Sequence, residues 1–451
     1  MRKVFLIVAF LVFLLAFVAG QKAEIQILLD AVKANLPILS AKQAEIAAAQ
    51  LSNELVDLAK RPKLDAAYQA NLATYNNLTG MFLPGQILPV SGPPTINNFF
   101  DPVMGSAASL LLSWQPYTFG QDTRQKKIYA ATAEIKKAEA DNELFQYQLY
   151  ALNAYLDWQM AGEMMVFYQK NLIRTLELSE QVNALTSRGL QPAVDSAMVL
   201  SEISRLKIEV LNVQKIQENY RIILTYVCGT DPTLEETTFF FDKLPTALFP
   251  ETNKPIHPLL QLANNQIIAG EAQVDLIKNQ IKPKIQLWGT TYARGSGIDP
   301  QGETEFIKGL GLQRFNYGFG AQISYPLLRG AEIKTETKRQ SLLVLAQKEQ
   351  LNHQRQHMSE QQQLARHALE SALKTTQEIP HQKHANEYVL QALTGRYKNG
   401  LVNFSEVLHA QYNLIKTESD LNKAHWEAWK ALLLLAATSG NLDIFLNQLA
   451  N

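Results

Sequence analysis

The sequence has little of what most metal, nucleic-acid and catalytic sites require. Its 451 residues contain one cysteine, Cys228, which excludes an internal disulfide and a metal site built from several cysteines. Neither charge is in excess, with 42 basic and 42 acidic residues, so the basic surface that nucleic-acid binding needs is not expected. No nucleophile elbow, phosphate-binding loop or dinucleotide fingerprint is present. We therefore expect no enzyme activity, no cofactor and no nucleic-acid partner.

Long apolar runs are also scarce. The exception follows Arg2 and Lys3, where an uncharged stretch over 4–19 ends at the small residues Ala19 and Gly20. This order is typical of a secretory signal peptide, which we predict over 1–20. The alternative is a retained membrane anchor, for which the stretch is short. Because no later run is long enough to span a membrane as a helix, insertion of the remaining chain would have to use strands.

Proline and glycine interrupt the chain in the same order twice. Matching pairs with equal separations are Pro37–Pro62 and Pro258–Pro283 (25 residues), and Gly189–Gly229 and Gly400–Gly440 (40 residues). Matching breaks in two halves predict a duplicated unit of helix, two strands, long helix, turn and helix. We place the first repeat at 21–229 and the second at 256–440. A linker at 230–255 separates them, and a tail occupies 441–451.

Each repeat contains two short segments in which the period of apolar residues falls from about 3.6 to about 2. In the first, Leu64, Tyr68 and Leu72 alternate with Asp65 and Gln69. Such alternation predicts a strand with one apolar and one polar face. Four strands are expected, near 64–75, 106–115, 285–294 and 315–325.

The helical segments are unusually long. The pattern from about 121 to 187 is unbroken and corresponds to about 100 Å of helix. The helix leaving the turn at Gly189 and the helix entering the second pair of strands together measure roughly 93 Å. Each repeat can therefore form a hairpin whose second arm consists of two pieces, which abut near 230–254.

Four strands cannot close a membrane barrel, since bacterial barrels have at least about eight. A spanning sheet with unpaired edges would leave backbone groups unsatisfied in lipid. Several copies of the chain would therefore have to share one barrel. The alternative is a water-soluble sandwich on helical stalks, which leaves the signal peptide and the long helices unexplained.

One stretch carries a family resemblance. Arg396-Tyr397-Lys398-Asn399-Gly400, followed by Glu406-Val407-Leu408-His409-Ala410-Gln411, is similar to the helix-tip pattern of the TolC family of outer-membrane efflux proteins. With the repeat and the strand-exit residues Pro116 and Pro326, the chain resembles that family over essentially its whole mature length. The resemblance implies a mainly α protein with a membrane β-barrel. It is expected to be a homotrimer with a 12-stranded barrel on a long α-helical periplasmic tunnel.

The resemblance also implies a function. The expected role is a passive exit duct in the outer membrane of a Gram-negative bacterium, extending into the periplasm. It would serve a tripartite efflux or type I secretion system. Its partners would be a periplasmic adaptor protein, an inner-membrane transporter and outer-membrane lipid. The competing hypothesis is a periplasmic coiled-coil scaffold or adaptor without channel activity, which would not need strands with a lipid-like face.

By position, the resemblance places a periplasmic gate at the two helical turns. Its candidates are Asp195 in the first turn and Tyr397 and Glu406 in the second. His409 stands where some members have a second acid. Alternatively, Asp195 and Glu406 are charges that stabilise helix N-termini.

The gate also needs a cation. Val402 stands where some members have an arginine, so Arg188 or Arg396 is expected to supply the positive charge. The surfaces expected to dock the adaptor are Gly189-Leu190 and Gly400-Leu401.

Histidines offer a competing site. His353 and His357 are four residues apart, with Glu360 one turn later, a spacing compatible with Zn(II) or Cu(II). His381 and His384 follow on the same helix, where Pro380 predicts a kink or an end. The surrounding residues are rich in glutamine and lysine, so we expect a solvated polar face and no metal.

Overall fold

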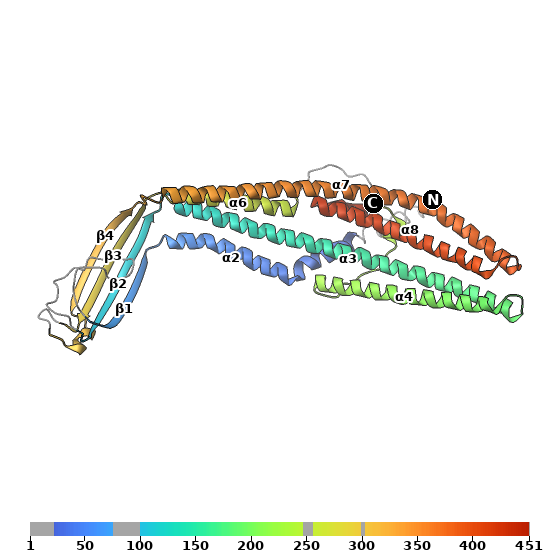
Figure 1. Cartoon of the computed structure of the whole chain (residues 1–451), viewed down its shortest axis with the longest axis horizontal. Helices are drawn as coiled ribbons and strands as arrows, with labels where there is room; N and C mark the ends of the chain where they lie inside the picture. Colours follow the sequence, from blue (N-terminus) through green and yellow to red (C-terminus); the bar gives the residue numbers. More distant parts are fainter. Residues whose placement is uncertain (1–21, 75–99, 247–255, 299–302, 451) are drawn as a thin grey trace, which may run out of the picture. The chain divides into compact units, whose positions relative to one another are not determined.

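The computed structural model describes residues 22–74, 100–246, 256–298 and 303–450 (Figure 1). The predicted signal peptide therefore lies outside the described residues, as do parts of the predicted linker. The chain divides into two compact units. We call Met1–Ala47, Glu134–Ile267 and Ala346–Asn451 the helical unit, and Ala48–Ala133 and Ile268–Leu345 the sheet unit.

Two long helices dominate the chain. α3 (Gln121–Ser187, 67 residues) and α7 (Gly330–Lys398, 69 residues) are each followed, after a short turn, by a helix of 36 residues: α4 (Ala193–Cys228) and α8 (Phe404–Ser439). α7 continues through Pro380, so the helix end considered there is wrong. In the described part of the chain, no helix combines the length and the hydropathy needed to cross a membrane.

Shorter helical elements accompany the long helices, and two of them, α2 and α6, contribute residues to both units. Residues 22–35 are helical, and α2 (Pro37–Ala59) begins after a break at Leu36, where the sequence placed a proline interruption. α5 (Phe239–Asp242), α6 (Pro258–Asn279), α9 (Asp443–Leu446) and the 3₁₀ helix η2 (Asn447–Ala450) follow.

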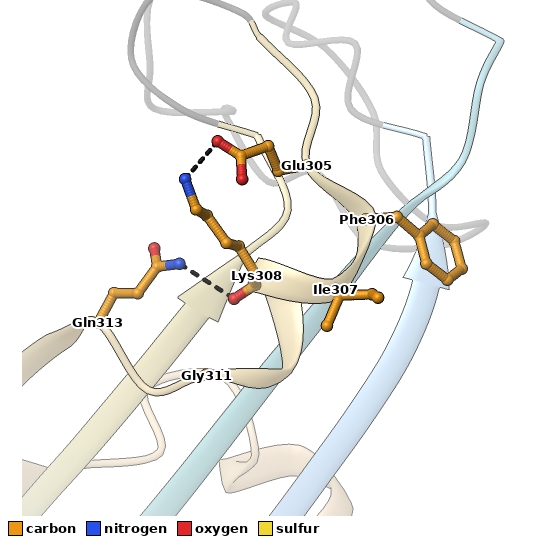
Figure 2. Close-up of a pocket in the computed structure, with 6 residues that line it drawn as sticks. All are labelled: Glu305, Phe306, Ile307, Lys308, Gly311 and Gln313. Carbon is orange, nitrogen blue, oxygen red and sulfur yellow. Dashed lines mark hydrogen bonds and ion pairs between the residues drawn. The ribbon is translucent and has the colours of Figure 1, made fainter.

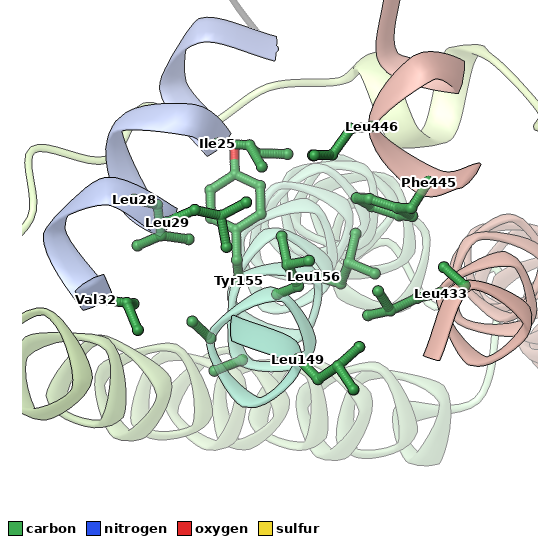
Figure 3. Close-up of a cluster of buried hydrophobic side chains, with 14 of the residues drawn as sticks. Ile25, Leu28, Leu29, Val32, Leu149, Tyr155, Leu156, Leu433, Phe445 and Leu446 are labelled. Carbon is green, nitrogen blue, oxygen red and sulfur yellow. The ribbon is translucent and has the colours of Figure 1, made fainter. Parts of the chain in front are cut away.

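An apolar core joins the helical segments of this unit (Figure 3). Its largest fully buried side chain is Trp429 of α8, whose ring contacts those of Phe239, Phe240 and Phe445 at centroid distances of 5.2 to 5.9 Å. The indole Nε1 of Trp429 donates a hydrogen bond to the carbonyl of Lys243, 3.1 Å away. Since buried aromatic rings contribute the most apolar area per residue, this cluster anchors the chain just after α4 to α8.

The sheet unit contains one antiparallel sheet in the order β1-β2-β3-β4. Its strands are β1 (Lys63–Ala73), β2 (Val103–Tyr117), β3 (Lys284–Ser296) and β4 (Arg314–Ser324). The central β2–β3 pairing joins strands from the two halves of the sequence. β1 and β4 each have one neighbouring strand among the described residues, so the sheet has two open edges.

The register places most of the apolar residues of the four strands on one face. Leu64 pairs with Leu112, Leu112 with Gly289, and Gly289 with Phe319. We call the face that contains these residues the apolar face. It also carries Tyr68, Leu72, Leu110, Trp114, Leu287, Phe315, Tyr317 and Ile323. Tyr317 and Phe319 are each 85% exposed. The opposite, polar face carries Asp65, Gln69, Asn71, Ser109, Gln286, Arg294, Arg314, Asn316 and Gln322, together with the apolar residues Leu111 and Trp288.

Candidate functional site at the two helical turns

The first turn, residues 188–192, ends α3 through a left-handed glycine. Gly189 has a φ of 70°, which glycine adopts without a steric penalty. The amide of Gly189 donates to the carbonyl of Thr186 and that of Leu190 to the carbonyl of Leu185, both at 3.0 Å. These are the two hydrogen bonds of a Schellman motif, and they make the turn rigid.

The second turn, residues 399–403, has the same backbone. Gly400 has a φ of 71°, its amide donates to the carbonyl of Tyr397 at 2.9 Å, and the amide of Leu401 donates to the carbonyl of Arg396 at 3.0 Å. Two segments with the same Gly-Leu sequence therefore end two long helices in the same way.

Leu190 and Leu401 project from these turns into solvent, at 64% and 66% exposure. In a Schellman motif this position usually packs against the residue five places earlier. In the second turn that residue is Arg396, which offers no apolar partner of this kind. Both turns thus hold an apolar side chain in water on a rigid backbone, an arrangement suited to contact with another protein.

A buried hydrogen bond connects the two hairpins. The hydroxyl of Tyr397 donates to Oδ2 of Asp195 at 2.8 Å, and these side chains belong to residues that are 2% and 6% exposed. Gln191 Nε2 donates to the carbonyl of Tyr397 at 3.2 Å. Burial, followed by the bond to Asp195, raises the pKa of Tyr397 above its ordinary value. The hydroxyl therefore remains a donor at neutral pH.

Apolar side chains from all four helices surround this bond. Val182 of α3, Val199 of α4, Tyr397 of α7 and Phe404 and Val407 of α8 form one buried cluster. The rings of Tyr397 and Phe404 lie 5.3 Å apart. A carboxylate beside such a cluster is costly without a partner, so the Tyr397 hydroxyl is needed to satisfy it.

The other predicted gate residues are not part of this contact. Arg188, Arg396, Glu406 and His409 are all exposed. Among the described residues none of the four forms an ion pair. The expected pairing of Arg188 or Arg396 with a gate acid is therefore not made within the single chain, and a pairing between copies stays a prediction.

A deeper polar contact was missed in the sequence. Gln411 Nε2 of α8 donates to Oγ1 of Thr175 in α3 at 2.6 Å, and both residues are buried. Nearby, Arg174 Nη1 lies 3.6 Å from Glu418 Oε2. Gln411 closes the motif that suggested the family, but nothing in that motif indicates a partner in α3.

The histidines of α7 are the remaining candidates for a metal site. The rings of His353 and His357 lie 6.5 Å apart on an exposed part of α7. Within the described ranges, no group of three histidine, cysteine or acidic side chains is arranged to hold a metal ion.

A shallow pocket lies at the 3₁₀ helix η1 (Phe306–Leu310) of the sheet unit (Figure 2). Glu305 and Lys308 form an ion pair there, and Gln313 Nε2 donates to the carbonyl of Lys308 at 3.0 Å. Its lining residues include no nucleophile beside a base.

Sequence comparisons find no relative: no protein-family model and no curated protein matches the chain. Solved structures do match. The outer-membrane channel OprN is 17% identical, with a TM-score of 0.70 over 93% of this chain and 90% of that one. The outer membrane protein VceC of Vibrio cholerae is 15% identical, with a TM-score of 0.70 over 93% and 96%. The open state of the MtrE outer membrane channel of Neisseria gonorrhoeae is 16% identical, with a TM-score of 0.68 over 93% and 89%.

At sequence identities this low, the TM-scores show that the fold is similar. A coverage of 93% includes most of both the helical unit and the sheet unit. The resemblance indicated by the second turn is thereby confirmed. The chain has the fold of the TolC-like outer membrane factors.

Proposed function

We propose that the protein is a passive exit duct in the outer membrane of a Gram-negative bacterium, with its helices in the periplasm. The matching structures are outer-membrane channels, which supports this role. The observation that carries it is the sheet, which has one continuous apolar face and two open edges. The proposal includes removal of residues 1–20 as a signal peptide and two repeats joined by the linker at 230–255.

The sheet favours assembly of three copies. The edges β1 and β4 present unpaired backbone groups. In a membrane, lipid cannot form hydrogen bonds with these groups and water does not reach them. If β4 of one copy pairs with β1 of the next, three four-stranded sheets close into a barrel of 12 strands. The apolar face then meets lipid, and the polar face lines the lumen.

The helices favour the same assembly. α4 carries exposed apolar residues, among them Val194, Leu200, Ile208, Leu211 and Ile222. At about 100° per residue these lie within one broad stripe of the helix. An exposed apolar stripe of this length requires a partner, and in the proposed trimer that partner is a helix of the neighbouring copy.

In this proposal, the two turns form the gate and the docking surface for the adaptor. The Asp195–Tyr397 bond holds the two hairpins of one copy together, as a closed gate requires. Arg188, Arg396, Glu406 and His409, exposed at the same end, would meet the neighbouring copies. Leu190 and Leu401 would dock a periplasmic adaptor, which joins the duct to an inner-membrane transporter of an efflux or type I secretion system.

Conductance and mass together test this proposal. The purified protein, without residues 1–20, is expected to have the mass of a trimer by light scattering in detergent and to give single-channel currents in a planar bilayer. A monomer that never conducts would reject the duct and favour the alternative, a periplasmic coiled-coil scaffold or adaptor. That alternative has no use for the apolar face of the sheet.

A further inference from the structure

Two arginines face each other on the polar face of the sheet. Arg294 near the end of β3 is paired directly with Arg314 at the start of β4. Side chains of directly paired residues in an antiparallel sheet have Cβ atoms about 4.5–5.5 Å apart and point to the same side. Both residues are exposed, and neither forms an ion pair with another described residue. Two arginine side chains without an ion-pair partner therefore project from directly opposite positions on the same face.

Charge is distributed unevenly around this pair. The chain as a whole is neutral, and the apolar face of the paired strands carries no charged residue. The polar face of these strands carries four basic residues and one acid: Lys63, Lys284, Arg294, Arg314 and Asp65. Asp65 lies level with Thr290, four residues before Arg294, and so about 13 Å from it along the strand. It is too far away to neutralise the arginines.

The neighbouring backbone holds the pair in place and leaves it open. The segment around η1 packs on the opposite face, where a Cβ at Gly295 would collide with the carbonyl oxygens of Gly309 and Gly311. The amide of Gln313 donates to the carbonyl of Arg294 at 2.8 Å and fixes the start of β4 beside the end of β3. Figure 2 shows Gln313 and η1 above these strands. The arginines therefore extend from rigid backbone into free space.

Folding alone gives no reason for this arrangement, because like charges directly opposite in a sheet are destabilising. An anion between them reverses that effect. Each guanidinium offers a planar fork of donors that matches a carboxylate or a phosphate, and two forks surround one anionic group.

We propose that Arg294 and Arg314 form a binding site for the carboxylate or phosphate groups of solutes. The inference rests on the proposed duct, in which the polar face lines the lumen. Three such pairs then form a positively charged ring at the loop end of the barrel. Anionic solutes bind there as they leave, and the ring favours anions over cations.

Tripolyphosphate block in a planar bilayer of neutral phosphatidylcholine tests the site. Because the helical unit cannot cross the bilayer, the strand loops face the chamber opposite to the one in which the protein is added. Tripolyphosphate in that chamber is expected to block the wild-type current. In Arg294→Gln/Arg314→Gln the half-blocking concentration should rise by at least about tenfold, which corresponds to about 1.4 kcal/mol.

Three comparisons make the result specific. Arg294→Lys/Arg314→Lys keeps the charge but removes the planar forks, so its half-blocking concentration should lie between those of the wild type and the double glutamine variant. Lys284→Gln removes a positive charge from the same face of β3, ten residues away, and should leave the block from the loop side unchanged. The ratio of chloride to potassium permeability, from reversal potentials in a KCl gradient, should fall in the double glutamine variant.

The outcomes separate the two proposals. A wild type that does not conduct contradicts the duct itself. A conducting protein whose block is the same in the double glutamine variant overturns the anion site and leaves the duct intact. If the arginines matter only when anionic lipid is present, they contact lipid headgroups, and the site is again overturned.

Discussion

The hydroxyl of Tyr397 donates a hydrogen bond to the carboxylate of Asp195, which lies 202 residues earlier in the sequence. The bond connects the two helical hairpins at their turns and lies beside an apolar cluster to which all four helices contribute. In one chain it is therefore a buried polar link between the two turns.

Tyr397→Phe should loosen the two turns. The change keeps the ring but leaves the Asp195 carboxylate buried without its donor, a cost of about 1–3 kcal/mol. Hydrogen exchange at residues 185–190 and 396–401 should become faster, and in the proposed duct the open probability should rise. Asp195→Asn retains an acceptor for Tyr397 and serves as the milder control. Equal exchange rates in Tyr397→Phe and the wild type would contradict this role.

The leucines of the turns should affect binding and not folding. Leu190→Ser/Leu401→Ser removes two exposed apolar side chains, so the melting temperature and the conductance should stay at wild-type values. Affinity for an adaptor should fall, since burying one leucine contributes about 1.5–3 kcal/mol. The measurement is co-purification with a co-expressed adaptor protein. As a matched control, Leu364→Ser removes a similarly exposed leucine from α7 outside the turns.

Replacement of the turn glycines, by contrast, should lower the stability of the folded protein. Gly189→Ala and Gly400→Ala each place a Cβ on a residue with a φ near 70°, where an L-residue is strained by about 1–2 kcal/mol. No atom lies within 4 Å of that Cβ in either turn, so the backbone alone causes the loss. Each variant should therefore melt at a lower temperature. Gly395→Ala, in an open position inside α7, should not lower the melting temperature. An unchanged melting temperature in all three variants would show that the turns contribute nothing to stability.

The two faces of the sheet should differ in their tolerance of charge. Phe319→Lys puts an ammonium group on the apolar face, and facing lipid it should cost about 2–4 kcal/mol. Asn316→Lys changes the polar face of the same strand and should be tolerated. The measurement is the yield of membrane-inserted trimer on unheated gels. Equal yields for the two variants would contradict a lipid-facing surface at Phe319.

His257 should make stability fall in acid. Burial lowers its pKa below the ordinary value of 6.5, against the opposing effect of its contact with the Ala437 carbonyl. The neutral ring fits, because Nε2 lies 3.2 Å from that oxygen and Nδ1 accepts the Leu259 amide at 3.1 Å. As the pH falls, the histidine of the unfolded chain binds a proton before that of the folded chain. The contribution of His257 to stability is therefore fully present above pH 6.5 and is lost as the pH drops below it.

Thermal melts between pH 8 and pH 5 check this dependence. His257→Asn keeps an acceptor for the Leu259 amide and removes the titrating ring, so its melting temperature should fall less between these limits. His425, whose pKa burial also lowers, accounts for part of the remaining slope. An unchanged slope in His257→Asn would assign the whole effect to other groups.

The local elements were accessible from the sequence because each depends on neighbouring residues. The alternation of Leu64 with Asp65 indicates β1, and the glycines at 189 and 400 indicate the ends of α3 and α7. Contacts between distant segments were not accessible. The resemblance named Asp195 and Tyr397 as gate residues, but their direct bond depends on how four helices pack.

The same limit applies to the two arginines. Arg294 is the last residue of the strand predicted near 285–294, and Arg314 lies just before the strand predicted near 315–325. The number of residues between them does not determine the register. The close packing that glycine permits at 295 and 309 sets the path of η1, and with it the pairing of β3 with β4. No periodic pattern in the sequence contains that information.

The order β1-β2-β3-β4 also has a consequence for how the chain folds. β1 and β2 are close together in the sequence, and so are β3 and β4. By contrast, β2 pairs with β3 across a large separation, as in the hydrogen bond from Thr290 Oγ1 to the carbonyl of Leu110, 180 residues apart. Contacts between such distant residues form slowly, because a long loop must be closed first. The helical hairpins can form soon after synthesis, whereas the centre of the sheet must wait for the second half of the chain. Until then β2 presents an open edge to any other strand, which is the period in which this protein is most exposed to aggregation.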